Sequence, residues 1–199
     1  MHRRNILLGA GALVFVPAFA PQAWAANPAE DFVSSNIQAG FDILNDQNLT
    51  PVARRDRFAT FLLGLTDARR VAVFLLGRYA DGASQDDLDA YVTAYQDYAL
   101  SIYQAYFQLY AGQTLRVVSS RERAPGDFIV TTRMVGQPNI AMEIDFRVRT
   151  DGAKPLLVDV AVAGVWLSLA QRDQIQAVLA QNNGDIKALI THLRSGRNG

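Results

Sequence analysis

The sequence predicts an α+β fold in which a helical layer packs on a curved four-stranded antiparallel sheet. Apolar residues recur at helical spacing up to about residue 112 and then alternate with a period of two as far as residue 162. Short turns such as Ala124-Pro125-Gly126 separate consecutive strands, and such turns favour an antiparallel meander. Helical spacing returns after Gly164 and breaks again at Gly184, which predicts two final helices.

The first 25 residues have the pattern of a cleaved export signal. Arg3 and Arg4 precede an apolar run, and Ala23-Trp24-Ala25 is a small-x-small cleavage site. The apolar run is shorter than the roughly 20 residues that a membrane-spanning helix needs. We therefore expect residues 1–25 to be removed on export, by either the general secretory or the twin-arginine route, and residues 26–199 to form a single domain.

The composition excludes several classes of function. Without Arg3 and Arg4, 17 of the 19 basic residues remain against 19 acidic ones, a net charge near −2. Nucleic-acid-binding domains carry a basic patch, and the sequence shows none, so no nucleic-acid partner is expected. The chain has no cysteine, and His192 is the only histidine after the export signal, which argues against a transition-metal site. No cofactor is expected.

Four helices are predicted before the sheet, over residues 28–45, 51–65, 67–79 and 84–112. The first two begin with an N-cap side chain followed by proline, at Asn27-Pro28 and Thr50-Pro51. The fourth helix has the clearest apolar stripe, and it is rich in tyrosine: Tyr91, Tyr95, Tyr98, Ile102, Tyr106 and Leu109. Because buried tyrosine hydroxyls need partners or water, some of these side chains should border a wet cleft.

The four strands are predicted from Leu115 to the turn at Ala124 and over 128–134, 140–148 and 156–162. One face of the sheet should be apolar and should meet the helices. Its residues are Phe128, Val130, Met134, Ile140, Met142, Ile144, Phe146, Val160 and Val162. On the opposite face, Glu143 and Asp145 should form cross-strand ion pairs with Arg147 and Arg149.

The sequence contains no catalytic motif: no nucleophile elbow, phosphate-binding loop or dinucleotide fingerprint. Asp86, Asp87 and Asp89 fall in the first turn of the fourth helix, where acidic residues complement the helix dipole. Asp159 is flanked by apolar residues on its own face of the predicted strand. We favour an ion pair with a nearby arginine for Asp159 over a role as a catalytic base.

Three segments together resemble the MlaC family. They are Leu76-Gly77-Arg78-Tyr79, the tyrosine-rich helix up to Gly112, and the region from Asp159 to Leu193. The resemblance implies a periplasmic, non-enzymatic phospholipid carrier with an apolar pocket between helices and sheet. Family members move phospholipid between an inner-membrane ABC transporter with an MCE-domain subunit and an outer-membrane lipoprotein–porin complex. This transport maintains the lipid asymmetry of the outer membrane.

With that resemblance, the apolar side chains named above become candidates for contact with acyl chains. The predicted lipid-binding residues are Tyr95, Tyr98, Ile102, Tyr106, Phe128, Val130, Met142, Ile144, Phe146, Val160, Val162 and Trp166. Trp166 stands where a small residue is expected from the resemblance, and the alternation through Val160 and Val162 directs it towards the pocket mouth. Its indole would then narrow that mouth.

Arg78 and Arg172 lie in the family-like segments. They are expected either to pair with acids such as Asp67 or Asp159, or to contact the headgroup or a partner at the mouth.

Three alternatives stay open from the sequence. The protein could carry a different lipid. It could be an isomerase- or dehydratase-like α+β enzyme that uses Asp159 with a tyrosine of the long helix on an apolar substrate. It could also be an adaptor with a filled core.

Overall fold

The structure is a computed structural model that describes residues 27–107, 112–136 and 142–196. The predicted α+β fold is confirmed, with helices before and after an antiparallel sheet. The helices are α1 (Pro28–Asn45), α2 (Pro51–Leu65), α3 (Ala68–Leu76), the 3-10 helix η1 (Gly77–Ala80), α4 (Gln85–Phe107), α5 (Leu167–Gln181) and α6 (Ile186–Gly196). The strands are β1 (Thr114–Ala124), β2 (Asp127–Val135), β3 (Glu143–Arg149), β4 (Leu156–Val162) and β5 (Val165–Trp166).

The predicted caps place the helix starts correctly. Asn27 Oδ1 accepts a hydrogen bond from the Ala29 amide at 3.0 Å, and Thr50 Oγ1 accepts one from the Ala53 amide at 3.2 Å. Asp67 caps α3 in the same way. At α4, Ser84 Oγ accepts a hydrogen bond from the Asp87 amide at 3.1 Å, and the Ser84 hydroxyl donates to the Asp87 carboxylate at 2.8 Å.

The five strands follow the chain order β1-β2-β3-β4-β5 across one antiparallel sheet, one strand more than the sequence predicts. The additional strand, β5, pairs with β4 through a tight turn at Ala163 and Gly164, which have φ angles of 50° and 80°. Two consecutive residues with positive φ are typical of the short hairpin turns that match the twist of a sheet.

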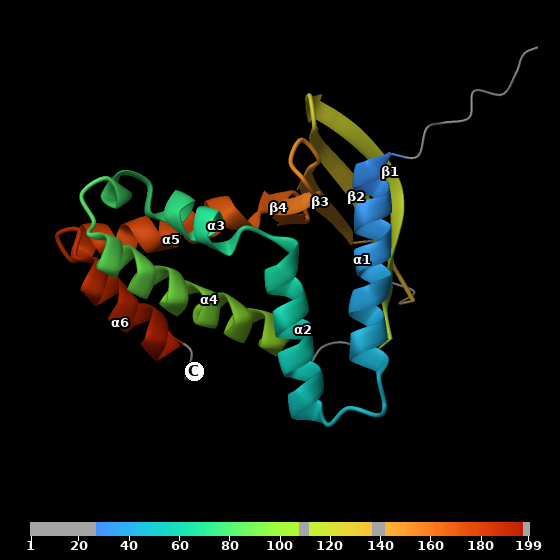
Figure 1. Cartoon of the computed structure of the whole chain (residues 1–199), viewed down its shortest axis with the longest axis horizontal. Helices are drawn as coiled ribbons and strands as arrows, with labels where there is room; N and C mark the ends of the chain where they lie inside the picture. The colour runs from blue at the N-terminus through green and yellow to red at the C-terminus, as the bar shows by residue number, and fades with distance from the viewer. Residues whose placement is uncertain (1–26, 108–111, 137–141, 197–199) are drawn as a thin grey trace, which may run out of the picture.

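Buried apolar residues form two separate clusters. The helical cluster lies among α3, α4, α5 and α6 and includes the fully buried Leu75, Leu76 and Leu189. The sheet cluster is smaller and joins Ala29 and Val33 of α1 to β2 and β3. Figure 1 shows these two parts of the molecule side by side, with α2 standing between the helical part and α1. None of the described helices has the length and apolar character needed to cross a membrane.

The polar face of the sheet carries cross-strand ion pairs, as predicted, but with different partners. Glu143 pairs with Arg133 at 2.9 Å rather than with an arginine of its own strand. Arg147 donates two hydrogen bonds to Asp127, at 3.0 and 2.8 Å, and holds the pKa of that carboxyl below its usual range. Arg133 and Glu143 face each other directly across β2 and β3, whereas Arg147 lies opposite Ile129 and reaches Asp127 diagonally.

Candidate functional site

The inner face of the sheet, which we define as the face covered by α1, brings together seven of the twelve predicted lipid-binding residues. Strand register aligns them in rows across β2, β3 and β4. The rows are Phe128 with Val148, Val130 with Phe146 and Val160, and Thr132 with Ile144 and Val162. Met142 lies opposite Met134 and begins the next row, because the Met134 amide donates to the Met142 carbonyl at 3.0 Å.

Burial is uneven across this inner face. Val130 and Val148 are fully buried under α1. Met142, Ile144 and Val162 are only half-buried, although they belong to the same apolar face. The row ends at Val165 of β5, which pairs with Val162 and is 57% exposed. The helices in the described part of the chain therefore leave this end of the apolar face incompletely covered.

Helix α2 stands on the side of the sheet towards which the inner face points. Its apolar residues, like those at the Met142 end of that face, are at most half-buried. None of its residues is buried, although Phe58, Phe61 and Leu62 give it an apolar side. Phe58 and Phe61 pack with ring centroids 5.7 Å apart. A side chain at Gly40 of α1 would meet both rings at 3.3 and 3.4 Å, so this glycine lets α1 and α2 approach closely.

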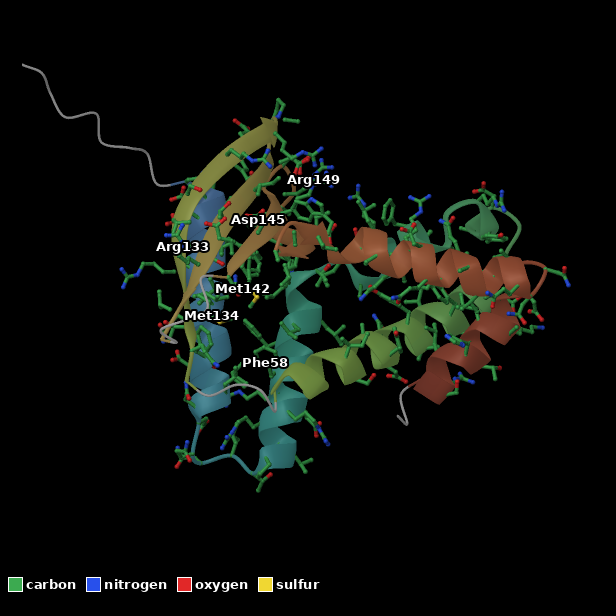
Figure 2. All side chains as sticks on the ribbon, turned by 180° about the vertical axis from the view of Figure 1, so that it is seen from behind. Phe58, Arg133, Met134, Met142, Asp145 and Arg149 are labelled. Atoms are coloured by element: carbon green, nitrogen blue, oxygen red, sulfur yellow. The ribbon has the colours of Figure 1, made fainter. Side chains whose placement is uncertain are left out.

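Figure 2 shows how this region is arranged. Met142 points from the sheet towards the side where α2 lies, whereas Arg133 projects away from it. Phe58 extends from α2 on the side nearer the sheet. The helical spacing of Phe58 and Phe61 predicts an apolar side of this helix but does not relate Phe58 to the sheet residues. No pattern in the sequence indicates which element α2 would face.

The tyrosine stripe of α4 lies elsewhere, contrary to the expectation that it faces the sheet across one pocket. Tyr91 and Tyr95 belong to the helical cluster. The Tyr91 hydroxyl donates to the Ala72 carbonyl at 3.1 Å, and burial raises its pKa. The Tyr95 hydroxyl donates to Gln171 of α5 at 2.6 Å. The stripe packs against α5 and α6, which follow the sheet in the chain, so the periodicity of α4 alone does not indicate these partners.

The remaining predicted lipid-binding residues of the stripe are Tyr98, Ile102 and Tyr106. Tyr98 lines a cavity of about 30 Å³ with Gln171 and His192, which has room for water but not for an acyl chain. Ile102 is half-buried in the last turns of α4. The side chain of Tyr106 lies outside the part of the chain that the structure describes, as does Ile140.

Trp166 does not share the face of Val160 and Val162, and this corrects the predicted orientation. It pairs with Ala161, so its side chain lies on the opposite face of the sheet. The turn at Ala163 and Gly164 is responsible, because it makes Val165 rather than Trp166 the partner of Val162. Trp166 then serves as the N-cap residue of α5.

Arg78 and Arg172 do not form the ion pairs with Asp67 or Asp159 that we favoured. Among the described residues, no carboxylate lies within ion-pair distance of either guanidinium. The Arg172 guanidinium lies 4.7 Å from the centre of the Phe74 ring. Arg78 lies over the ring of its neighbour Tyr79 and donates to the Tyr79 hydroxyl at 3.1 Å.

Both predicted acids make helix-capping contacts, and Asp159 also lies opposite Arg147 across β3 and β4, where its charge adds to that of Asp127 in raising the pKa of Arg147. Asp67 caps α3, and Asp159 accepts hydrogen bonds from the backbone amide and the hydroxyl of Ser168 in the first turn of α5. The described part of the chain also contains no cluster of three or more His, Cys, Asp or Glu side chains that could hold a metal ion.

Comparisons with known proteins agree with this fold. A family model described as "MlaC protein" matches residues 34–195. The chain is also similar to a solved structure, the phospholipid-binding protein from Ralstonia solanacearum in complex with a phospholipid. The TM-score is 0.75 at 17% identity, over 86% of this chain and 98% of that chain, so the likeness concerns the fold. A search of curated proteins finds no match. Because the family model spans most of its length, this chain belongs to the MlaC family.

Proposed function

We propose that this protein is a phospholipid carrier that holds acyl chains against the inner face of the sheet. The observation that carries the proposal is the half-buried end of that face, formed by Met142, Ile144 and Val162 next to an α2 helix without a buried residue. A sheet-on-helix domain normally buries such a face completely. An acyl chain placed between the sheet and α2 would complete the burial on both sides.

The energetic requirement of carrying lipid through water fits such a surface. A diacyl phospholipid exposes about 30 methylene groups, and each contributes roughly 0.8 kcal/mol when it is removed from water. The carrier must therefore cover most of the chain length with apolar side chains. In this proposal Phe128, Val130, Phe146 and Val160 line the rest of the site on the same face, while the headgroup stays outside.

Membership of the MlaC family supports the wider role. We infer that the protein works in the periplasm and passes lipid between an inner-membrane MCE-domain ABC transporter and an outer-membrane lipoprotein–porin complex. The similar Ralstonia solanacearum structure holds a phospholipid, which supports this class of cargo over other lipids. Arg78 and Arg172 carry no carboxylate partner among the described residues, so they are the candidates for contact with an anionic headgroup or a partner.

The enzymatic alternative has less support. It needs Asp159 and a tyrosine of α4 to face one apolar site. The Asp159 carboxylate instead caps α5 through Ser168, and the Tyr95 hydroxyl is bonded to Gln171 inside the helical cluster.

The direct test is to identify what the exported protein holds. The full chain is produced with its export segment, purified from the periplasm without detergent, and extracted with organic solvent for mass spectrometry. We expect about one phospholipid per protein, and its headgroup and chain lengths will define the cargo. Extracts that contain no lipid, from protein that is folded by circular dichroism, would contradict the proposal. A single lipid of another class would correct the cargo.

A further inference from the structure

Two methionines lie side by side at the half-buried end of the inner face. The chain has three methionines, and Met1 belongs to the export segment, so Met134 and Met142 are the only ones in residues 26–199. The Met134 amide donates to the Met142 carbonyl at 3.0 Å across β2 and the start of β3. Figure 2 shows both residues at this end of the sheet.

Both thioethers are positioned where a small polar oxidant can reach them. Neither residue is buried, in contrast to Val130 and Val148 under α1 on the same face. A methionine sulfur that solvent can reach reacts with peroxides and hypochlorous acid to form the sulfoxide. Because acyl chains would cover this end of the face in the loaded carrier, the same sulfurs should be shielded when lipid is present.

We propose that Met134 and Met142 form a paired oxidation site whose modification by peroxide-class oxidants prevents lipid binding, and which bound lipid protects. The inference rests on the proposed carrier function. In each reaction the thioether sulfur donates a lone pair to one oxygen of hydrogen peroxide and the O–O bond breaks. The second oxygen leaves as hydroxide and takes the proton of the hydroxyl now bound to sulfur, which gives water and the sulfoxide. The sulfur loses two electrons, and the peroxide is reduced by two.

The surroundings of the pair explain why oxidation would expel lipid. A sulfoxide oxygen is a strong hydrogen-bond acceptor and must be solvated or paired. Leu115, the partner of Met134 on β1, and Ile144, two residues after Met142 in the chain, are apolar. The one hydroxyl in the adjacent row, that of Thr132, already donates to the Ile144 carbonyl at 2.9 Å. Two sulfoxides would therefore keep water at this end of the face, in the space that the acyl chains need.

The fold itself should tolerate the change. The two methionines belong to neither cluster of buried residues, so the added oxygens can point to solvent when the site is empty. Loss of lipid is thus expected without loss of secondary structure. Leucine is the matched replacement, because it keeps the apolar volume and cannot be oxidised.

The test compares lipid-loaded and delipidated protein, purified after export and treated with hydrogen peroxide. Peptide mapping gives the oxidation rate at each methionine, and native mass spectrometry gives the lipid bound before and after treatment. Lipid at about 100 times its Kd leaves roughly 1% of the protein empty, so oxidation should slow by ~10-fold or more in the loaded form. Delipidated, doubly oxidised protein should rebind at most about a tenth of the lipid that untreated protein rebinds.

The double variant Met134→Leu/Met142→Leu is the control. The lipid that this variant holds before peroxide is its own reference, and the same amount should remain bound after peroxide, whatever its starting occupancy. Equal oxidation rates in the two forms, full rebinding by the doubly oxidised protein, or unfolding of that protein by circular dichroism would overturn this inference. The lipid content measured before peroxide tests the proposed function separately, because its absence there contradicts the carrier function whatever the methionines do.

Discussion

The carboxylate of Asp159 on β4 accepts hydrogen bonds from both the backbone amide and the hydroxyl of Ser168 on α5. This contact joins the last long strand to the helix that follows it and satisfies an amide of the first helical turn, which has no partner within the helix. It also gives a structural reason for an acidic residue in an otherwise apolar strand. Asp159 therefore holds α5 in place on the sheet.

Replacing Asp159 by alanine should lower stability without changing lipid content. Loss of a capping side chain costs about 1 kcal/mol, which corresponds to a fall in Tm of roughly 2–4 °C for a domain of this size. Asp159→Asn keeps an acceptor oxygen for the Ser168 amide and should lose less. Thermal unfolding followed by circular dichroism measures both variants, and an unchanged Tm in Asp159→Ala would contradict the capping role.

A charge on the inner face should exclude lipid. Ile144→Arg places a guanidinium between Thr132 and Val162, where an unpaired buried charge costs several kcal/mol once acyl chains remove the water. We expect organic extracts of this variant to contain no phospholipid while its circular dichroism is retained. Val118→Arg is the matched control, because Val118 is 45% exposed at the β1 bulge. Full lipid occupancy in Ile144→Arg would contradict the placement of the site.

The fluorescence of Trp166 should be insensitive to lipid. Trp166 is the only tryptophan after residue 25, and it lies on the face of the sheet opposite to Val160 and Val162. Quenching by bromine requires near contact, so lipids brominated along the acyl chain should leave its emission unchanged. Quenching that varies with the bromine position would show instead that the indole contacts the chains, and the narrowed mouth expected from the sequence would regain support.

Arg172 and Arg78 should differ in their effect on stability. Arg172 stacks on Phe74 and thereby connects α5 to α3, so Arg172→Ala should destabilise the protein by about 0.5–1 kcal/mol. Arg78 is exposed, and its guanidinium contacts Tyr79, its sequence neighbour, so Arg78→Ala should leave the midpoint of urea unfolding unchanged. If Arg172→Ala retains full stability but slows lipid transfer to the membrane complexes, its role is in headgroup or partner contact.

The Asp127–Arg147 pair should make stability depend on pH in the acid range. Because Arg147 lowers the pKa of Asp127 in the folded protein, this contribution is complete above the unfolded pKa of about 3.9 and is lost as pH falls through the lower folded value. Asp127 is only 8% exposed. Replacing it by asparagine should lower the free energy of unfolding at neutral pH by on the order of 1–2 kcal/mol.

The same Asp127→Asn variant should show a flatter loss of stability below about pH 4, measured by urea unfolding at several pH values. Glu143→Gln is the control, because the Arg133–Glu143 pair is about half exposed and should contribute little. An equally steep acid transition in Asp127→Asn would assign the pH dependence to other carboxylates.

Local signals in the sequence determined most of the element order. Side-chain caps at Asn27, Thr50 and Asp67 act within three residues, and so they mark helix starts wherever the helix later packs. The change in the spacing of apolar residues near residue 113 likewise indicates directly that the backbone changes from helix to strand. The short strand β5 was missed, because two residues carry too little pattern to be recognised.

The tertiary structure alone decided which apolar surfaces meet. Tyr95 and Ile144 both lie on apolar faces of their elements, yet Tyr95 packs in the helical cluster and Ile144 is half-buried on the sheet. Periodicity defines the face of an element but not its partner, because the hydrophobic effect has no direction and the partner depends on the area that all other elements offer. Trp166 shows that a single turn can defeat a prediction from alternation. After the two residues with positive φ, Ala163 and Gly164, Val165 pairs with Val162 and Trp166 lies on the opposite face of the sheet, and this is known only from the strand register.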